Sequence, residues 1–307
     1  MMRIAIAVFV ISLSALSVLA QAPPTLRIVT EVPNLPSELF YGDIKVKPLR
    51  LRPGTNTPIT INDADFFVHQ QYVDFLSRMP DQSGFNFWVN QITGCAGNAA
   101  CVDVQRVNSS GAFFLSIEFI GTGYFVYRLH KGSFGDLPRY ATFMPDTRQV
   151  ANGVIVGQGD WQGTLTANQT AFANAWVDRP AFLARYPTTL SATAYVTSLI
   201  ETAGLTGQVD PGPIVTEMGT GYPLATARAI GLRRVIESSA FDAKEKSPAF
   251  VLMQYFGYLR RNPNDAPDNN LDGYNFWLTK LNNHNGDFHA AEMVKSFIVS
   301  GEYFARF

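Results

Sequence analysis

The stretch from Arg260 to Trp277, RRNPNDAPDNNLDGYNFW, carries the densest set of side chains in the chain that could bind a cation. Asp265, Asp268, Asn270 and Asp272 follow one another within this short polar segment. Carboxylate and amide oxygens are the ligands that calcium prefers in proteins. The segment therefore offers a calcium site, and calcium is the only cofactor that the sequence suggests.

The spacing of this segment fits a calcium loop only in part. An EF-hand loop places oxygen ligands at positions 1, 3 and 5, glycine at position 6 and glutamate at position 12. Counted from Asp268, the residues Asn270, Asp272 and Gly273 fit, but position 12 is Thr279, which has no carboxylate. The alternative is a polar turn in which Asp272 is the N-cap of the following helix, a role that contributes about 1 kcal/mol. Both interpretations stay open, and any calcium affinity is expected to be weak.

The rest of the chain lacks the motifs of common catalytic sites. It contains no G-x-S-x-G elbow, no H-E-x-x-H pair and no G-x-x-x-x-G-K-[ST] loop. The four histidines have no metal-ligand spacing; they are His69, His130, His284 and His289. No catalytic residue is therefore predicted, although the two acids of a glycosidase can lie far apart in a chain.

The N-terminal segment predicts export. MMRIAIAVFVISLSALSVLA has one arginine, then an apolar run, then small residues, which is the layout of a secretory signal peptide cleaved after Ala20. The alternative is an uncleaved membrane anchor, for which the run is short. We therefore expect a periplasmic or extracellular protein that has no transmembrane span after cleavage.

The composition favours a packed globular protein. Apolar residues make up 47% of the chain and charged residues 16%, which argues against disorder. The net charge of −1 provides no broad basic surface for nucleic acid. Cys95 and Cys101 bracket the short loop AGNAA, so an oxidising compartment predicts one local disulfide that contributes about 2 kcal/mol.

One segment of the chain occurs twice. FVHQQYVDFLSRMPDQSGFNFW begins at Phe67, and FVLMQYFGYLRRNPNDAPDNNLDGYNFW begins at Phe250, with an insertion of six residues in the later copy. FFLSIEF and FIVSGEY close the two copies, and FVYRLHKGSFGDLP with RRVIESSAF forms a weaker third copy between them. The predicted organisation is a signal peptide at 1–20, an extended segment or linker at 21–61, and helical units at 62–121, 122–246 and 247–307, the middle unit being expanded and diverged.

Each copy predicts helices. Apolar residues recur at three- and four-residue steps, the first stripe ends at Arg-x-Pro, and a glycine precedes the second helix. Residues 21 to about 60 alternate in TLRIVTEV and IKVKPLRLRP, which is typical of extended structure. The expected fold is mainly α: repeats of about three helices each, packed into one array, with a short extended or β-like N-terminal segment.

The repeated pattern F-V-x-x-x-Y-x-x-F-L-x-R-x-P-D-x-x-G-x-x-x-W, closing with S-x-E-[FY], resembles domain-of-unknown-function family 4214. The match covers Phe67–Phe119 and Phe250–Phe307 well, and the middle unit poorly. The resemblance implies a helical module of secreted and cell-surface bacterial proteins. It brings no catalytic residues to this chain.

The shared residues also have structural roles that the repeat itself predicts. Arg78 is expected to pair with Glu118, and Arg261 with Glu302, each as a planar guanidinium on a carboxylate. The two repeated tryptophans are expected to anchor helices in the core rather than to stack on sugars; they are Trp88 and Trp277.

These observations predict an exported, non-catalytic helical module with a binding or scaffolding role at the bacterial cell envelope. Its partner is expected to be a protein or a glycan. The alternative is a secreted, glycan-directed hydrolase whose site lies in the middle unit, between Asp146 and Thr216. A cleft with close carboxylates and an exposed aromatic ring would favour that alternative.

Overall fold

The computed structural model describes residues 26–29, 38–41, 44–46, 51–52, 54–219 and 221–307. The chain separates into two compact units, Met1–Pro48 and Leu49–Phe307, and each is described by itself. The predicted signal peptide lies outside the described residues. Within the described parts of the chain, no helix combines the length and the apolar character needed to cross a membrane.

The described part of the first unit is a small antiparallel sheet. Its strands follow the order β1-β2-β3, and Leu26 pairs with Tyr41 and Leu39 with Val46. The bounds are β1 Leu26–Val29, β2 Glu38–Tyr41 and β3 Ile44–Val46. These strands fall in the segment whose sequence alternates between apolar and polar residues.

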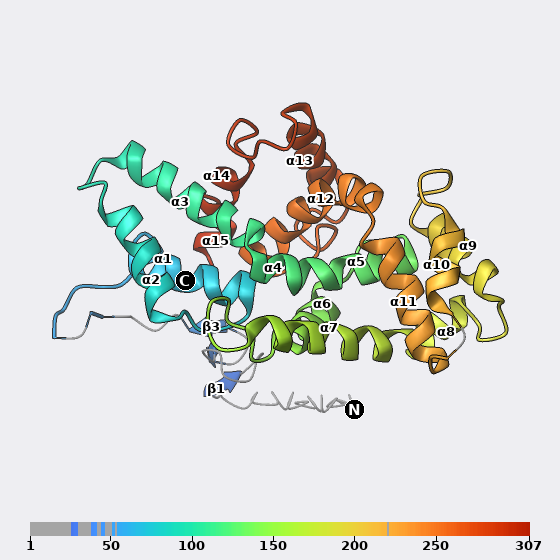
Figure 1. Cartoon of the computed structure of the whole chain (residues 1–307). Coiled ribbons are helices and arrows are strands. Elements are labelled where there is room, and N and C mark those ends of the chain that lie inside the picture. Colours follow the sequence, from blue (N-terminus) through green and yellow to red (C-terminus); the bar gives the residue numbers. More distant parts are fainter. Residues whose placement is uncertain (1–25, 30–37, 42–43, 47–50, 53, 220) are drawn as a thin grey trace, which may run out of the picture. The chain divides into compact units, whose positions relative to one another are not determined.

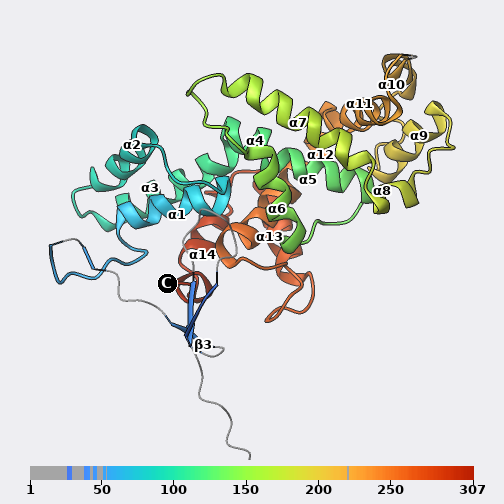
Figure 2. The ribbon, with the colours of Figure 1, turned by 90° about the horizontal axis from the view of Figure 1, so that it is seen from below.

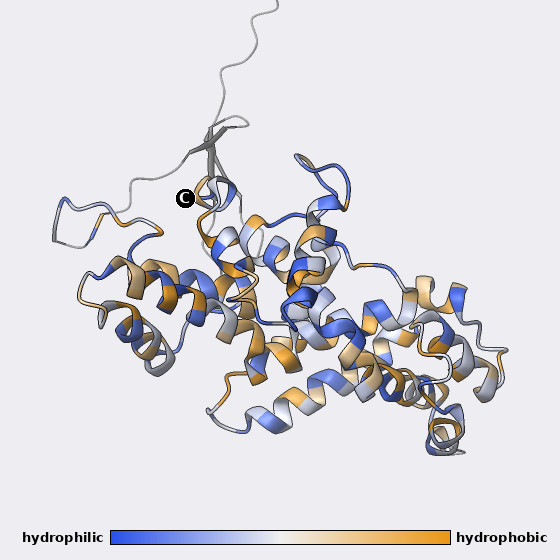
Figure 3. Cartoon of the chain, turned by 90° about the horizontal axis from the view of Figure 1, so that it is seen from above, coloured by the Kyte–Doolittle hydropathy of each residue, from blue (hydrophilic) through white to orange (hydrophobic). Residues whose placement is uncertain are grey.

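The second unit is helical, so the protein is mainly α as the sequence predicts. Figure 3 shows hydrophobic and hydrophilic residues along the same helices, and the buried hydrophobic ones form a shared core. The bounds are α1 Ala64–Leu76, α2 Gln82–Thr93, α3 Ala99–Leu115, α4 Ile117–Gly121, α5 Gly123–Phe134, α6 Tyr140–Ala151, α7 Trp161–Val177, α8 Pro180–Arg185, α9 Ala192–Thr202, α10 Pro211–Met218, α11 Leu224–Ile236, α12 Ser239–Gln254, the π-helix η1 Tyr255–Leu259, α13 Asp272–Asn283, α14 Met293–Ile298 and α15 Gly301–Phe304.

The described helices form four groups of three; the short helices α4, α8 and α15 close the first, second and fourth groups, and the start of the longer α12 closes the third. The first group is α1, α2 and α3, the second is α5, α6 and α7, and the third is α9, α10 and α11. In the fourth group the first helix is the end of α12 together with η1, the second is α13 and the third is α14. Figures 1 and 2 show α1, α2 and α3 side by side, and likewise α9, α10 and α11. The segment 122–246, predicted as one expanded unit, thus contains two helical groups.

The same local signals end and begin the helices of each group. The first helix of every group stops at or near a residue with left-handed backbone geometry; these residues are Ser77, Gly135, Gly204 and Arg260. Three of the closing helices then start with a serine whose hydroxyl accepts a hydrogen bond from a backbone N–H of the first turn; the serines are Ser116, Ser238 and Ser300. Such caps satisfy N–H groups that have no partner inside the helix.

The groups pack in two similar pairs. In the first and fourth groups, α1 contacts η1 and α3 contacts α14. In the second and third groups, α5 contacts α9 and α7 contacts α11. Each pair thus joins first helix to first helix and third helix to third helix, so the pairing of groups is itself repeated.

Equivalent residues meet where the first and fourth groups join. Phe75 and Tyr258 occupy the same place in the two sequence copies, and their ring centroids lie 5.3 Å apart. A Cβ atom added to Gly257 would lie 2.8 Å from the Phe75 ring. Glycine is therefore required at this position, because any side chain would force Phe75 to move.

A buried ion pair also joins these two groups. The Asp74 side chain is 1% exposed and lies 2.8 Å from Arg306 and 3.2 Å from Arg260. Arg306 donates to the carbonyl oxygens of Gly257 and Tyr258 as well. The pair thereby links the first helix of the chain's first group to the end of the fourth group.

Candidate functional site

Arg78 stands at the centre of a polar cluster in the first group. Its Nε and Nη2 atoms donate to the two carboxylate oxygens of Glu118 at 2.5 and 2.8 Å. Asp81 lies 3.4 Å away on the other side, and the guanidinium stands 4.9 Å from the centre of the Tyr72 ring. The predicted pairing of Arg78 with Glu118 is present, in the bidentate geometry that fixes both side chains.

The fourth group holds the same cluster. Arg261 donates to Glu302 at 2.6 and 3.0 Å and to Asp268 at 2.8 Å, and lies 5.4 Å from the Tyr255 ring centre. The role of Asp81 thus belongs to Asp268, a residue of the six-residue insertion. This explains one of the acids that the sequence left without a structural role.

Glycine lets each tyrosine reach its cluster. A Cβ atom at Gly84 would overlap the Tyr72 hydroxyl, and a Cβ at Gly273 would lie 2.8 Å from the Tyr255 hydroxyl. Burial raises the pKa of Tyr72 to about 12, and burial likewise raises the pKa of Tyr255 to about 12. Both phenols therefore stay protonated at neutral pH, and neither is a base.

The two inner groups lack the cluster. Asp136 stands at the position of Arg78 in the second group, and Ala181 and Ala240 replace Glu118 in the closing helices of the second and third groups. The arginine clusters are thus a property of the first and fourth groups alone. Since their carboxylates are already held by arginine, their geometry suits a rigid joint between helices.

A pocket of about 310 Å³ lies beside the first cluster. Arg78, Asp81 and Glu118 line it together with Tyr72 and the half-buried Trp88. Two carboxylates and an aromatic ring therefore meet here. Both acids face Arg78, however, and the cluster has no free base or nucleophile among these side chains.

The acidic segment engages the protein rather than converging on one point. Asp265 accepts from the backbone and side-chain nitrogens of Asn262 at 3.0 and 2.6 Å and from Arg139 at 3.1 Å. Asn270 accepts from the backbone N–H of Asp272 at 2.8 Å. Among the described residues, no group of three or more acidic, histidine or cysteine side chains is placed to hold a metal ion.

One expectation for this segment is wrong. Asp272 was predicted to be the N-cap of α13, but it is the first residue of that helix and Leu271 occupies the N-cap position without a side-chain hydrogen bond. The Asp272 carboxylate accepts from the amide of Asn270 instead, at 2.9 Å. The preceding turn, held by Asn270, moves the helix start by one residue, although Asp272 still lies where the helix dipole favours an acid.

The repeated tryptophans pack against the core but are only half-buried. Trp88 lies 6.0 Å from Phe113 between ring centroids, and Trp277 lies 5.8 Å from Phe297. Each tryptophan also meets the phenylalanine before it edge-on, at 4.9 and 5.0 Å. Their place between helices agrees with an anchoring role, and their partial exposure leaves each ring accessible on one side.

Those neighbouring phenylalanines are exposed. Phe87 is 53% exposed and Phe276 is 58% exposed, at equivalent positions of the two copies. The sequence pattern contains both rings, but it does not indicate that they face solvent. The signal that could have revealed them is the helical spacing from the side of each helix that packs inward, which holds the half-buried Phe85 in one copy and the buried Tyr274 in the other.

The disulfide between Cys95 and Cys101 is present, as the sequence predicts. It closes the turn between α2 and α3, where Asn98 caps α3 by accepting from the N–H of Cys101. The bridge therefore holds two helices of the first group together and takes no part in the polar cluster.

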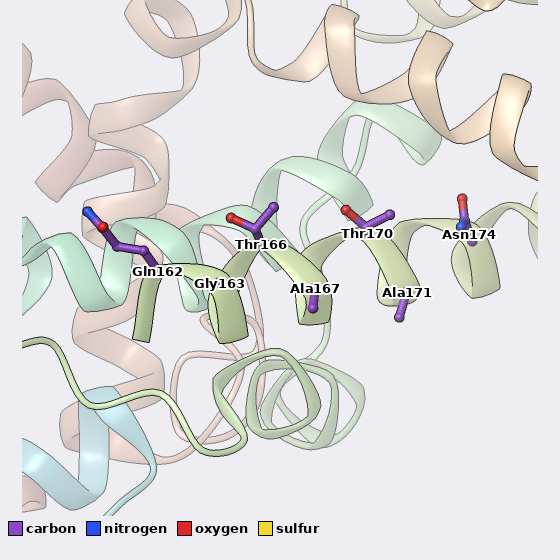
Figure 4. Close-up of a pocket in the computed structure, with 7 residues that line it drawn as sticks. All are labelled: Gln162, Gly163, Thr166, Ala167, Thr170, Ala171 and Asn174. Carbon is purple, nitrogen blue, oxygen red and sulfur yellow. The ribbon is translucent and has the colours of Figure 1, made fainter. Parts of the chain in front are cut away.

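The pocket in the middle segment lies along one face of α7. Figure 4 shows Thr166, Thr170 and Asn174 in a row along this helix, with Ala167 and Ala171 in a second row below it. None of its lining residues is acidic. Asp146, also in the range predicted for a hydrolase site, is held by Arg179 at 2.7 and 2.8 Å. The hydrolase alternative stays a prediction that no described pocket of this segment favours.

No protein-family model matches the chain, and comparison with characterised proteins and with solved structures finds no similar protein. The resemblance to family 4214 therefore stays a prediction. It depends on the motif that the first and fourth groups share.

Proposed function

We propose that the chain is an exported, non-catalytic helical repeat module that binds a protein or glycan of the bacterial cell envelope. The observation that carries this proposal is the exposure of Phe87 and Phe276. A single exposed aromatic ring is common in proteins. The same exposed ring in two diverged copies indicates instead that the position is kept for contact with a partner.

Other apolar side chains are exposed at equivalent places in the outer groups. Leu115 and Val299 are 44% and 53% exposed, each directly before the serine that caps the closing helix. In the inner groups that position holds Asp178 and Glu237, which are the usual choice for solvent. This contrast supports a binding role for the outer groups and a spacing role for the inner ones.

Envelope binding can be measured by co-sedimentation of the purified protein with isolated bacterial envelopes. We expect the double variant Phe87→Ser/Phe276→Ser to bind at least about tenfold more weakly, since two hydrophobic contacts are removed. The matched control is Val104→Ser, which removes another exposed apolar side chain, 51% exposed on α3. Equal binding by the double variant and the control would contradict the proposal.

The nature of the partner and the export step need separate measurements. Envelopes treated with protease lose a protein partner, whereas envelopes treated with periodate lose a glycan. Mass spectrometry of the protein recovered outside the cytoplasm should find an N-terminus at Gln21. Retention of the intact chain in the cytoplasm would contradict the exported part of the proposal.

A further inference from the structure

A third pocket, of about 570 Å³, lies where the second and fourth groups meet. Its walls come from the end of α5, from the middle of α12, and from α13 with the loop that precedes it. Pro138, Pro248, Tyr274 and Leu278 form apolar parts of the wall, and Glu245 lies among them. Several of its lining residues belong to the polar stretch from Arg260 to Trp277, but Glu245 lies outside every motif of the sequence.

The loop that carries the six-residue insertion forms one side of this pocket, through residues on either side of the insertion. Asn262 accepts from the backbone N–H of Tyr140 at 2.8 Å, and Arg139 donates to Asn264 at 3.0 Å and to Asp265 at 3.1 Å. These bonds hold the loop against the start of α6. The corresponding loop of the first group lacks the six inserted residues.

Glu245 is a buried acid that faces the pocket without a cation. Glu245 is 3% exposed and lines the pocket, and its carboxylate accepts a hydrogen bond from the Tyr127 hydroxyl at 2.8 Å. Burial, and then the charge of Glu245, raise the pKa of Tyr127 well above 10, so Tyr127 remains a donor. Among the described residues, no lysine, arginine or histidine lies within 4.0 Å of the Glu245 carboxylate.

The charged residues around the pocket are engaged elsewhere or exposed. Lys131 donates to the Gly135 carbonyl at 2.7 Å, and Lys244 donates to the Ala203 carbonyl at 2.5 Å. Arg139 is bound to the inserted loop, and the side chain of Asp136 is 75% exposed. Buried carboxylates are normally paired, because desolvating an unpaired charge is costly. Within the described part of the chain, Glu245 therefore has a hydrogen-bond donor in Tyr127 but no cationic partner, which a buried carboxylate normally has.

We propose that this pocket binds the lysine side chain of a partner polypeptide, with the ammonium group on Glu245. The proline, leucine and tyrosine surfaces would cover the aliphatic stem, and a charged tip at the end of an apolar stem is the character of lysine. An amino sugar carries an ammonium group too, but it has no aliphatic stem to lie along Pro138, Pro248 and Leu278. The pocket is separate from Phe87 and Phe276, so either proposal can fail alone.

The test uses the full chain and two matched peptides, acetyl-Ala-Lys-Ala-amide and the same peptide with norleucine in place of lysine. Saturation-transfer NMR and calorimetry should show binding of the lysine peptide. The norleucine peptide should bind at least about tenfold more weakly. Glu245→Gln keeps an acceptor for Tyr127 and should reduce lysine-peptide binding by a similar factor. The control Glu217→Gln changes an exposed acid that pairs with Arg234 and should have no effect.

Several results would overturn the proposal: equal binding of the two peptides, unchanged binding by Glu245→Gln, no binding at millimolar peptide, or binding of glucosamine in place of the lysine peptide. A second variant covers the case in which Glu245→Gln unfolds. Leu271 lines the pocket and is 38% exposed, so Leu271→Trp should fill the entrance and block the peptide while the helices stay folded by circular dichroism. Unimpaired binding by this variant would place the peptide elsewhere.

Discussion

The ion pair between Asp74 and Arg306 offers a sharp test of how the first and fourth groups are held together. Arg306 is 10% exposed and donates to both oxygens of the Asp74 carboxylate, at 2.8 and 3.0 Å. Arg306→Met keeps an apolar stem of similar length but removes all of these donors. The Asp74 carboxylate, which is 1% exposed, then loses one of its two arginine partners and keeps Arg260.

The expected loss follows from the remaining partners. Removing one member of a buried ion pair costs roughly 3–5 kcal/mol, because the other charge stays desolvated. Arg260 still lies 3.2 Å from Asp74 and offsets part of this cost. We therefore expect Arg306→Met to lower the free energy of unfolding by about 2–3 kcal/mol, which corresponds to a fall in Tm of roughly 5–10 °C for a unit of this size.

Urea unfolding followed by far-UV circular dichroism at pH 7 measures this loss. The single variant Asp74→Leu and the double variant Asp74→Leu/Arg306→Met complete a double-mutant cycle. We expect a coupling free energy between the two side chains of about 1–3 kcal/mol. The control is Arg139→Met, whose side chain is 55% exposed and pairs with Asp265, so that it should cost under about 1 kcal/mol. A loss for Arg306→Met no larger than that of the control, or simple additivity in the cycle, would refute the reasoning.

Four further outcomes are expected. Gly257→Val should lower the free energy of unfolding by roughly 1–3 kcal/mol because its Cβ meets a core ring, whereas Gly301→Ala, with open space around it, should not; urea unfolding distinguishes them. Burial holds the pKa of His130 below 6.5 in the folded state, whereas the unfolded chain takes up the proton near 6.5. The free energy of unfolding should therefore fall as pH drops below about 6.5. In thermal melts from pH 7 to pH 5, His130→Phe should make this fall in stability with pH smaller. Replacing Cys95 and Cys101 by serine should cost about 2 kcal/mol, and a melt unchanged by reducing agent would contradict it. Millimolar calcium should leave the Tm unchanged relative to chelator, since the acids of the inserted loop bind arginine and asparagine; a rise would restore the metal interpretation.

Much of the local architecture could be predicted from the sequence. The helix that ends before Arg78 and Pro80, the disulfide and the two arginine–glutamate pairs all follow from short spacings that recur in two copies. Such features depend on neighbouring residues, whose backbone preferences and reach are set by covalent geometry. A repeat adds a comparison within one chain, because a residue kept in both copies has a role in both.

The candidate sites were less accessible from sequence. Alignment of the two copies places Asp81 opposite Asn264, yet Asp268 takes over its contact with arginine after the insertion has folded back. Glu245 has no motif around it, and only the meeting of α5, α12 and α13 makes it a buried acid in a pocket. Sequence spacing cannot show which residues a loop brings together when the loop spans two helical groups.

The sequence by itself determined that this protein is a mainly α chain built from a repeated helical element, because amphipathic periods, proline and glycine breaks and serine caps act over a few residues. Tertiary structure decided that the middle segment holds two helical groups, that the outer groups join through Asp74 and Arg306, and that Phe87 and Phe276 face solvent. The physical reason is the range of the interactions. Burial and charge pairing arise only when residues far apart in the chain are brought together, and that depends on how all the helices pack at once.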